Sequence, residues 1–189
     1  MPLSTPAARA RMHTRRIELN GFLREDGLWD IEAHLTDEKS YGFNNEWRGR
    51  VEPGTPVHDM WIRLTVDDDR VVKAVEVVTD VGPYSMCPDI APNFQRLVGL
   101  KVGPGWNNRV KELVGGIRGC THLVELLGPV ATIVYQTQSP SLLRKKRGAA
   151  EAPKPEDPSR KPPNLDTCHA YASDSDVVKQ FYPAFYTGN

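Results

Sequence analysis

The segment WDIEAHL (Trp29–Leu35) alternates strictly between apolar and polar side chains. A period of two is typical of a strand that packs one face and exposes the other. The segment 57–66, VHDMWIRLTV, has the same character, and residues 71–79 are rich in β-branched side chains. Residues 17–23 alternate more loosely and end at a turn-forming EDG sequence. These segments predict an antiparallel four-stranded meander sheet with one packed and one open face.

The second half of the domain has helical spacing. A short helix is expected to begin at Pro92 and to run to about Gly99, and a second is expected over residues 106–114. The longest begins at Thr121, and Pro129 within it should kink or split it. Strands followed by helices predict an α+β fold with two to three helices packed on one face of the sheet, plus an extended C-terminal tail.

Composition divides the chain into four parts. Residues 1–14 are predicted to be a flexible, arginine-rich lead-in, and residues 15–140 a single α+β domain. Residues 141–166 form a linker rich in proline and charge, with the basic run RKKR at 144–147. Residues 167–189 regain aromatic side chains. This segment either docks on its own core or on a neighbouring subunit of a homo-oligomer, which we favour, or is a frayed tail.

Charge, hydropathy, cysteine count and the absence of known motifs in the sequence disfavour several classes of protein. The 189 residues carry 24 Lys and Arg against 24 Asp and Glu, which disfavours a nucleic-acid partner. No apolar run approaches the roughly 18–20 residues that span a membrane. Three cysteines give no disulfide framework, so we expect a cytoplasmic protein. Neither a nucleotide fingerprint nor a G-x-S-x-G elbow is present, so no organic cofactor is expected.

The strand that contains His58 is the first candidate source of chemistry. Strand geometry places His58 on the apolar face, and it places Asp59, Trp61 and Arg63 on the opposite face. His58 is either a core histidine or a proton-transfer group beside a pocket. The first interpretation is the more ordinary one for a histidine on an apolar face.

A glycine-rich loop before the longest helix is the second candidate. Arg118 and the amides near Gly119 could hold a negative oxygen at the start of that helix. His122 and Glu125 are spaced i, i+3, so they could form a carboxylate–imidazole pair. The alternative is a glycine break followed by a surface pair, and the sequence favours neither.

The loop YSMCP (Tyr84–Pro88) joins the last strand to the first helix. If it converges with the glycine-rich loop, Cys87, Cys120 and His122 could bind a metal, with Asp89 or Glu125 as a fourth ligand. The local Cys-x-x-Cys spacing that makes a zinc site convincing is missing.

A series of motifs occurs in order along the chain: His58–Thr65 with Asp67-Asp68, Cys87-Pro88, Leu97–Leu100 with Gly103–Trp106, and Arg118–Leu123 with Glu125–Pro129. Together they resemble a bacterial family known only as a domain of unknown function. The resemblance covers about residues 10 to 140. It implies a cytosolic bacterial protein, associated with the catabolism of aromatic or acyl compounds, and no established reaction.

Our leading hypothesis is a cofactor-independent acid–base enzyme, of lyase or isomerase type, acting on a small aromatic or oxygenated compound. The expected catalytic residues are His122, His58, Arg118, Glu125, Tyr84 and Asp59. The expected substrate-binding residues are Trp61, Trp106, Met86 and Gly119.

Two other classes remain open at this point. One is a non-enzymatic zinc or iron–sulfur module that uses Cys87, Cys120 and His122. The other is an assembly protein that uses the basic run and the aromatic C-terminal segment.

Overall fold

A computed structural model describes residues 3–138, 142, 148, 161–162 and 164–188. The chain divides into two compact units, Met1–Ser139 and Pro140–Asn189. Among the described residues, no helix is long and apolar enough to cross a membrane.

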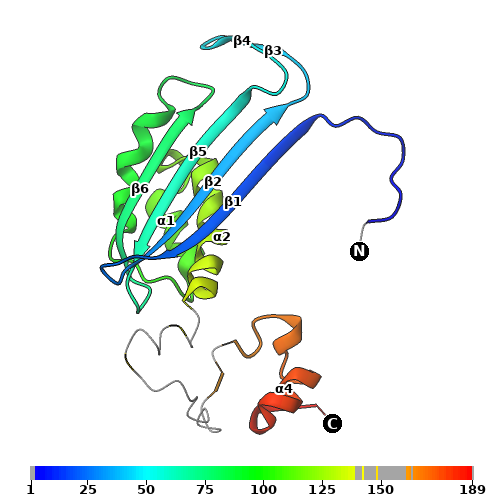
Figure 1. Ribbon diagram of the computed structural model, residues 1–189, viewed down its shortest axis with the longest axis vertical. Helices are drawn as coiled ribbons and strands as arrows, with labels where there is room; N and C mark the ends of the chain where they lie inside the picture. Colours follow the sequence, from blue (N-terminus) through cyan, green and yellow to red (C-terminus); the bar gives the residue numbers. More distant parts are fainter. Residues whose placement is uncertain (1–2, 139–141, 143–147, 149–160, 163, 189) are drawn as a thin grey trace. The chain divides into compact units, whose positions relative to one another are not determined.

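The first unit is built on a four-stranded antiparallel sheet. Its strands are β1 (His13–Leu23), β2 (Trp29–Lys39), β5 (Pro56–Val66) and β6 (Val72–Val81), in the spatial order β1-β2-β5-β6. Neighbours in the sheet are thus the successive long strands of the chain, as a meander requires (Figure 1). The predicted α+β fold class is confirmed. β1 begins two residues before the expected start of the domain, at His13.

Alternation along β2 decides which face of the sheet is packed. Trp29, Ile31, Ala33 and Leu35 are fully buried, and the polar residues between them are partly exposed. In β5 the buried set includes Met60, Ile62 and Leu64, and these side chains share the packed face with those of β2. Burying this apolar surface is the main force that holds the helices against the sheet.

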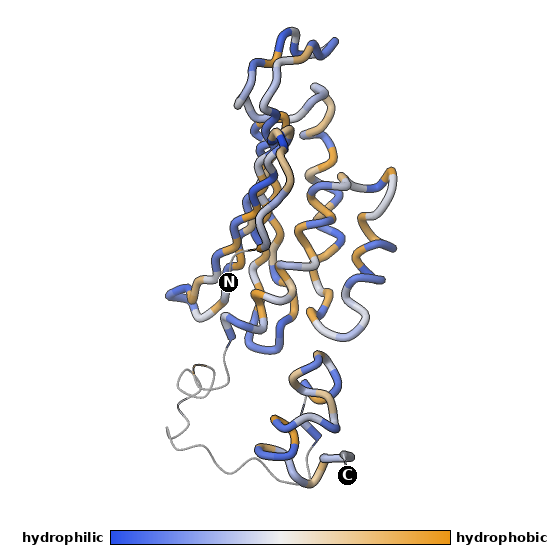
Figure 2. The backbone as a smooth tube through the Cα atoms, turned by 90° about the vertical axis from the view of Figure 1, so that its right-hand side faces the viewer, coloured by the Kyte–Doolittle hydropathy of each residue, from blue (hydrophilic) through white to orange (hydrophobic). Residues whose placement is uncertain are grey.

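The helices lie on one side of the sheet and form a second layer (Figure 2). They are the 3₁₀ helix η1 (Cys87–Leu97), α1 (Trp106–Val114), the 3₁₀ turn η2 (Gly116–Arg118) and α2 (Thr121–Thr137). The helix over 106–114 has the predicted bounds. The helix expected from Pro92 is instead a 3₁₀ helix that begins at Cys87. Pro92, within this element, lacks the N–H donor that an α-helix would use at that position.

Pro129 lies inside α2, and α2 is one helix, so the predicted splitting does not occur. Leu126 and Leu127 before the proline are buried, as are Val130 and Val134 after it. Packing on both sides of Pro129 therefore holds the two parts of α2 as one helix against the sheet and α1.

The segment expected to be a loop between β2 and β5 contains a small hairpin. Its strands are β3 (Phe43–Asn45) and β4 (Gly49–Val51). Each has three residues, too few for a periodic pattern to be recognised. The Asn45 carboxamide oxygen accepts the backbone N–H groups of Trp47 and Arg48, at 2.9 and 3.0 Å, and so fixes the turn.

The second unit contains η3 (His169–Tyr171), α4 (Asp176–Phe181) and η4 (Pro183–Phe185). The hydroxyl of Ser175 caps α4 by accepting the N–H of Val178, and Val178 is fully buried within this unit. Most of the expected linker, including the basic run at 144–147, lies outside the described residues. Docking of the aromatic segment stays a prediction.

Candidate functional site

A buried carboxylate, Asp37, is the centre of a polar cluster on the packed face of the sheet. It continues the alternation of β2 beyond Leu35, so its side chain points into the same layer as the apolar core. Cross-strand pairing places Arg15 of β1 and His58 of β5 directly on either side of it. Three adjacent strands therefore align a cation, a carboxylate and an imidazole in one row.

Hydrogen bonds use both oxygens of Asp37. Arg15 donates to them from Nε and Nη2, at 2.9 and 2.7 Å, in a bidentate arrangement. Nε2 of His13 lies 2.8 Å from one oxygen, and Nδ1 of His58 lies 2.9 Å from the other. Arg15 also donates from Nη1 to Glu125 of α2 at 2.5 Å, which ties the helix to the edge strand.

These contacts determine the charge of Asp37. Burial opposes its ionisation, but the hydrogen bonds from Arg15, His13 and His58 outweigh burial and hold the pKa of Asp37 well below its usual range. An ionised carboxylate can only accept hydrogen bonds. Nδ1 of His58 therefore carries a proton, and in the neutral ring Nε2 is left with a free lone pair.

A second imidazole packs against the first. The rings of His58 and His122 have centroids 3.8 Å apart and planes tilted by 37°. Burial, followed by the neighbouring His122, lowers the pKa of His58. Burial, followed by the positive charge of Arg15, lowers the pKa of His122. Both rings are therefore neutral at pH 7, which leaves each able to accept a proton.

A cavity of about 360 Å³ lies beside these two rings. It lies where the end of β6, the start of η1 and the start of α2 meet. Its lining brings together seven residues singled out from the sequence: His58, Tyr84, Met86, Cys87, Gly119, Cys120 and His122. The remaining lining residues are Met60, Pro83, Ile90 and Thr121.

Gly119 is needed for this convergence. A Cβ at Gly119 would fall within bonding distance of the carbonyl oxygen of Val114, so only glycine lets the loop pass α1 there. The N–H of Gly119 donates to the carbonyl oxygen of Gly116, so this amide is already engaged. It is therefore not free for the role expected for it, which was to hold a negative oxygen.

The structure places five expected site residues away from the cavity: Trp106, described below, and Asp59, Trp61, Arg118 and Glu125. Asp59 and Trp61 lie on the open face of the sheet. There a carboxylate oxygen of Asp59 is hydrogen-bonded to Nε2 of His34 at 2.7 Å, and the ring of Trp61 stacks on that imidazole with centroids 3.6 Å apart. Arg118 is exposed, and its backbone carbonyl accepts the side-chain amide of Asn93. Glu125 bonds Arg15 instead of His122, although its i, i+3 spacing allowed the other pairing.

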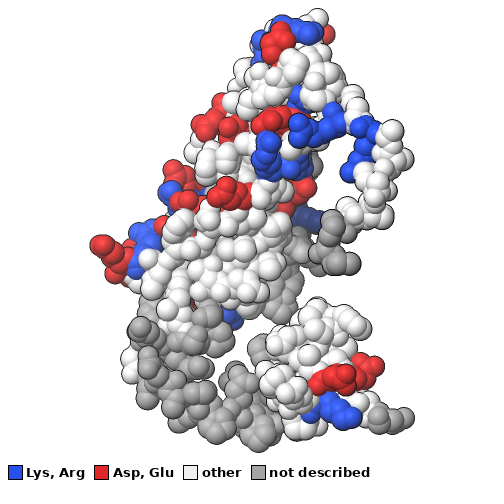
Figure 3. Space-filling view, turned by 45° about the vertical axis from the view of Figure 1, so that its right-hand side comes forward, with Lys and Arg blue, Asp and Glu red and all other residues white. Residues whose placement is uncertain are grey.

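Charged side chains of both signs lie next to one another on the side of the molecule shown in Figure 3. On the open face of the sheet, Arg63 bonds Glu32 at 2.8 Å and Glu76 at 2.6 Å. This surface is that of an ordinary solvated sheet, with its charges paired across strands.

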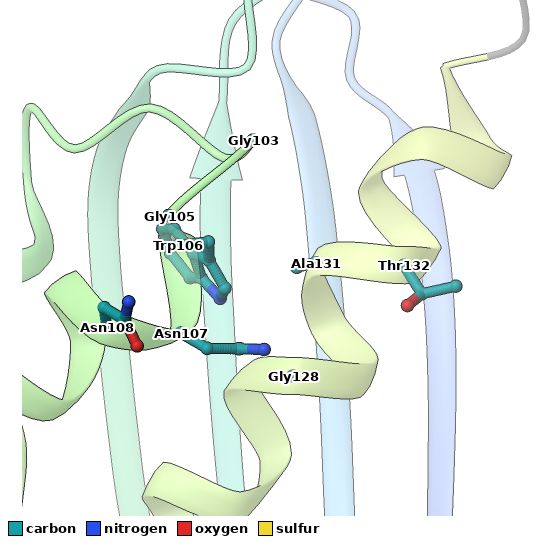
Figure 4. Close-up of a pocket in the computed structure, with 8 residues that line it drawn as sticks. All are labelled: Gly103, Gly105, Trp106, Asn107, Asn108, Gly128, Ala131 and Thr132. Atoms are coloured by element: carbon teal, nitrogen blue, oxygen red, sulfur yellow. The ribbon is translucent and has the colours of Figure 1, made fainter. Parts of the chain in front are cut away.

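Trp106 lies between α1 and α2, in a different place from the His58–His122 cavity. Its indole N–H donates to the carbonyl oxygen of Leu127 at 2.8 Å. It helps to line a second cavity of about 340 Å³. There Asn107 points from α1 toward Gly128 of α2 (Figure 4). In this position Trp106 secures the helix pair and forms no wall of the first cavity.

The sequence analysis missed three members of the cluster: Asp37, Arg15 and His13. For Asp37 a signal was present, because it is the next position in phase after the buried residues of β2. A carboxylate in phase with a buried strand face must have partners there. Arg15 and His13 carried no such signal, since their role depends on pairing with β2.

The structure thus defines an α+β protein with a histidine pair at the edge of its core. Over residues 13–136 the chain matches the family described as "Protein of unknown function (DUF2889)", and it belongs to this family. The resemblance to a family of unknown function is therefore confirmed. No curated protein and no solved structure matches the chain.

Proposed function

We propose that the protein is a cofactor-independent acid–base enzyme, of lyase or isomerase type, with its site in the His58–His122 cavity. One observation carries the proposal. His58 is held by a buried, ionised Asp37 and packs against a second imidazole at a cavity. A carboxylate behind an imidazole, with the opposite nitrogen free, is the arrangement of a general base.

The chemistry follows from the protonation states. Nε2 of His58 takes a proton from an acidic C–H or O–H bond of the substrate, and the electron pair stays on the substrate. Asp37 stabilises the imidazolium that forms. Return of the proton to a different substrate atom gives an isomerase, and its transfer to a leaving group gives a lyase. His122, next to His58, is the second group available for this transfer.

The size of the cavity supports a small substrate. At about 360 Å³ it lies at the lower end of the range of ligand pockets, roughly 300–1,000 Å³. A compound with one aromatic ring and oxygen substituents has a suitable volume and an acidic hydrogen. We therefore propose a small aromatic or oxygenated compound, processed in a catabolic pathway.

A proton-exchange experiment tests the proposal without knowledge of the full reaction. The protein is incubated in D₂O with a panel of ring-sized ketones, phenols and hydroxy compounds, and wash-in of deuterium at carbon is followed by ¹H NMR. We expect exchange with at least one compound, lost in His58→Gln and retained in His34→Gln. No exchange across the panel, or equal exchange in His58→Gln, would count against an acid–base enzyme.

The protonation states can be tested independently. The C2–H signals of His58 and His122, assigned from His58→Gln and His122→Gln, are followed against pH. Both should titrate below the ordinary histidine value of about 6.5. Titration of His58 well above that value would remove the neutral base on which the proposal depends.

A second candidate function is metal binding, and a specific observation favours it. A carboxylate oxygen of Asp37 and one nitrogen from each of His58 and His122 lie within 4.8 Å of one another. Sγ of Cys120 lies 3.8 Å from Nδ1 of His122, and Cys87 lines the same cavity. Since Arg15 already occupies both oxygens of Asp37, the carboxylate would support His58 from behind, and the imidazoles and thiols would be the ligands.

Elemental analysis of the protein, purified without chelator, decides between the two candidates. About one zinc or iron per chain, lost in Cys120→Ser, would make His122 a ligand and favour the non-enzymatic module. A metal content that is negligible and unchanged in Cys120→Ser would favour the acid–base enzyme.

The other expectations from the sequence remain part of this proposal. They are a bacterial, cytoplasmic protein, a small-molecule substrate with no nucleic-acid or membrane partner, and a homo-oligomer with contacts from the C-terminal segment. Deletion of the residues after Gln138 should change the oligomeric state and leave the sheet folded, which size-exclusion chromatography and circular dichroism can measure.

A further inference from the structure

The His58–His122 cavity is polar at one end and uncharged throughout. None of the described residues that line it is a lysine, arginine, aspartate or glutamate. Behind the histidines, Arg15 forms ion pairs with both Asp37 and Glu125, so its charge is already engaged. A ligand with a full negative charge would therefore find no free cation in the lining to balance it.

Apolar side chains form the rest of the lining. Met60 is almost completely buried, and Pro83 and Ile90 lie on the same lining. Tyr84 and Met86 are 50% and 58% exposed, which places them at the open end of the cavity. Thioether groups contact the edges and faces of aromatic rings favourably, so two methionines suit a planar ring.

The β3–β4 hairpin adds an aromatic residue outside the cavity. The rings of Trp47 and Tyr84 meet edge to face, with centroids 6.2 Å apart and an angle of 88°. The hairpin is anchored to β5, because Arg48 donates to the carbonyl oxygen of Pro56 at 3.1 Å. Trp47 is nevertheless 56% exposed, so the contact with Tyr84 leaves most of its indole ring open.

We propose that this cavity binds an uncharged planar ring with an ionisable hydroxyl group, a phenol, and that Trp47 and Tyr84 form the aromatic wall at its mouth. This inference rests on the proposed function and names the substrate class of that site. The ring lies among the methionines, and its hydroxyl meets the imidazoles. Its O–H bond breaks, the proton passes to Nε2 of His58, and a phenolate–imidazolium pair remains.

The alternatives fit the lining less well. A carboxylate or phosphate would enter already charged and meet two neutral imidazoles. A purely apolar ligand would leave Nε2 of His58 without a hydrogen-bond partner, since Asp37 engages only Nδ1 of that ring. A phenol enters without charge and separates charge only as its proton passes to His58, where the hydrogen bond to Asp37 partly offsets the burial that disfavours the new cation.

A matched pair of probes tests the substrate class. 4-Nitrophenol and 4-nitrobenzoate share a ring and a nitro group and differ in the hydroxyl or carboxylate. At a pH where free 4-nitrophenol is uncharged, isothermal titration of the full chain should show 4-nitrophenol binding more tightly than 4-nitrobenzoate, by on the order of tenfold or more. Equal or tighter binding of 4-nitrobenzoate, or no binding of 4-nitrophenol, would overturn the proposal.

The aromatic wall is tested with two exposed tryptophans. Trp47→Ala should weaken binding of 4-nitrophenol about fivefold, since an aromatic pair contributes on that order. Trp61→Ala, on the opposite face of the sheet, should leave it unchanged. Trp47→Phe should retain most of the affinity, and circular dichroism establishes that each variant is folded. Equal effects of Trp47→Ala and Trp61→Ala would remove Trp47 from the site.

Absorbance separates this inference from the proposed function, because 4-nitrophenol is yellow only as the phenolate. At a pH where the free probe is colourless, the bound probe should show the phenolate band in the wild type and should not show it in His58→Gln. Binding with the same band in both proteins would retain the ligand class and overturn the acid–base role of His58. Preference for 4-nitrobenzoate, together with His58-dependent deuterium exchange, would overturn the ligand class alone.

Discussion

The two faces of the sheet each carry an aspartate–histidine pair, and the two pairs are almost equally close. Asp37 and His58 lie 2.9 Å apart on the face covered by helices, and Asp59 and His34 lie 2.7 Å apart on the open face. Their surroundings differ. The side chains of Asp37 and His58 are 1% and 13% exposed, whereas those of Asp59 and His34 are 25% and 26% exposed.

The comparison shows that the hydrogen bond alone does not make a candidate site. On the covered face, Arg15 keeps the carboxylate ionised and His122 packs on the imidazole beside a cavity. On the open face, the ring of His34 stacks on that of Trp61, with an angle of 6° between the ring planes. Solvent screens the charged side chains of this face. Burial and an adjacent cavity are what distinguish the first pair.

The largest expected effect is on catalysis. With a compound that shows deuterium exchange, His58→Gln should lower the rate by about 10²- to 10⁴-fold, the usual contribution of a general base. His34→Gln should change it little, because His34 faces away from the cavity. His122→Ala should likewise reduce the rate far more than it reduces the melting temperature. Equal losses of rate and stability in His122→Ala would make His122 a structural residue.

The next effect is on stability. Asp37→Asn should lower the free energy of unfolding by about 3 kcal/mol, because it leaves Arg15 and two histidines without their charged partner. The control Asp59→Asn removes a partly exposed partner and should cost about 1 kcal/mol or less. Urea unfolding of both variants measures the difference. Similar losses in the two variants would mean that the buried and the open aspartate–histidine pairs contribute equally to stability.

A smaller effect should follow from pH. The pKa of His58 and of His122 is lowered in the folded protein, so the unfolded chain takes up protons first as the pH falls below about 6.5. The free energy of unfolding should therefore decrease from that pH downward, and less so in a His58→Gln/His122→Gln variant.

Asp37 acts in the same direction at lower pH. The pKa of Asp37 is lowered in the folded protein, so its full contribution to the free energy of unfolding is present above about pH 4. This contribution is lost as the pH falls toward the pKa of Asp37 in the folded protein. Urea unfolding at a series of pH values tests both statements. An increase in stability below pH 6.5 would contradict the assignment for the histidines.

The smallest effect is expected for Glu125→Gln. Arg15 and Glu125 are 29% and 49% exposed, so their ion pair should contribute less than about 1 kcal/mol. The loss should shrink further in high salt, which unfolding with and without added sodium chloride can measure. A salt-independent loss of several kcal/mol would show that Glu125 supports the cluster more directly than its exposure suggests.

Most of the fold was predictable because long strands carry a strong periodic signal. The alternation from Trp29 to Leu35 gave the strand and its packed face, and the helix from Thr121 followed from apolar spacing. The β3–β4 hairpin is too short to show a period. The continuity of α2 across Pro129 depends on packing by both halves of the helix, which local sequence does not contain.

The reactive residues of the cavity were predictable from the sequence, whereas their hydrogen-bond partners were not, and the difference has a physical reason. Five reactive residues were identifiable at strand ends, in loops and at the start of a helix, and all of them line the cavity: His58, Tyr84, Cys87, Cys120 and His122. The partners were not identifiable. Whether Glu125 bonds His122 or Arg15 depends on how close β1 comes to α2, a distance set by tertiary packing.

The bond between Arg15 and Glu125 also has a consequence for the order of folding. It joins residues 110 positions apart in the chain, whereas β1 with β2 and β5 with β6 are neighbours joined by short turns. Closing a long loop costs more entropy than pairing adjacent strands, so the sheet should form before α2 docks on it. A partly folded chain would then contain every strand of the sheet and yet have no cavity, because His122 arrives only with α2.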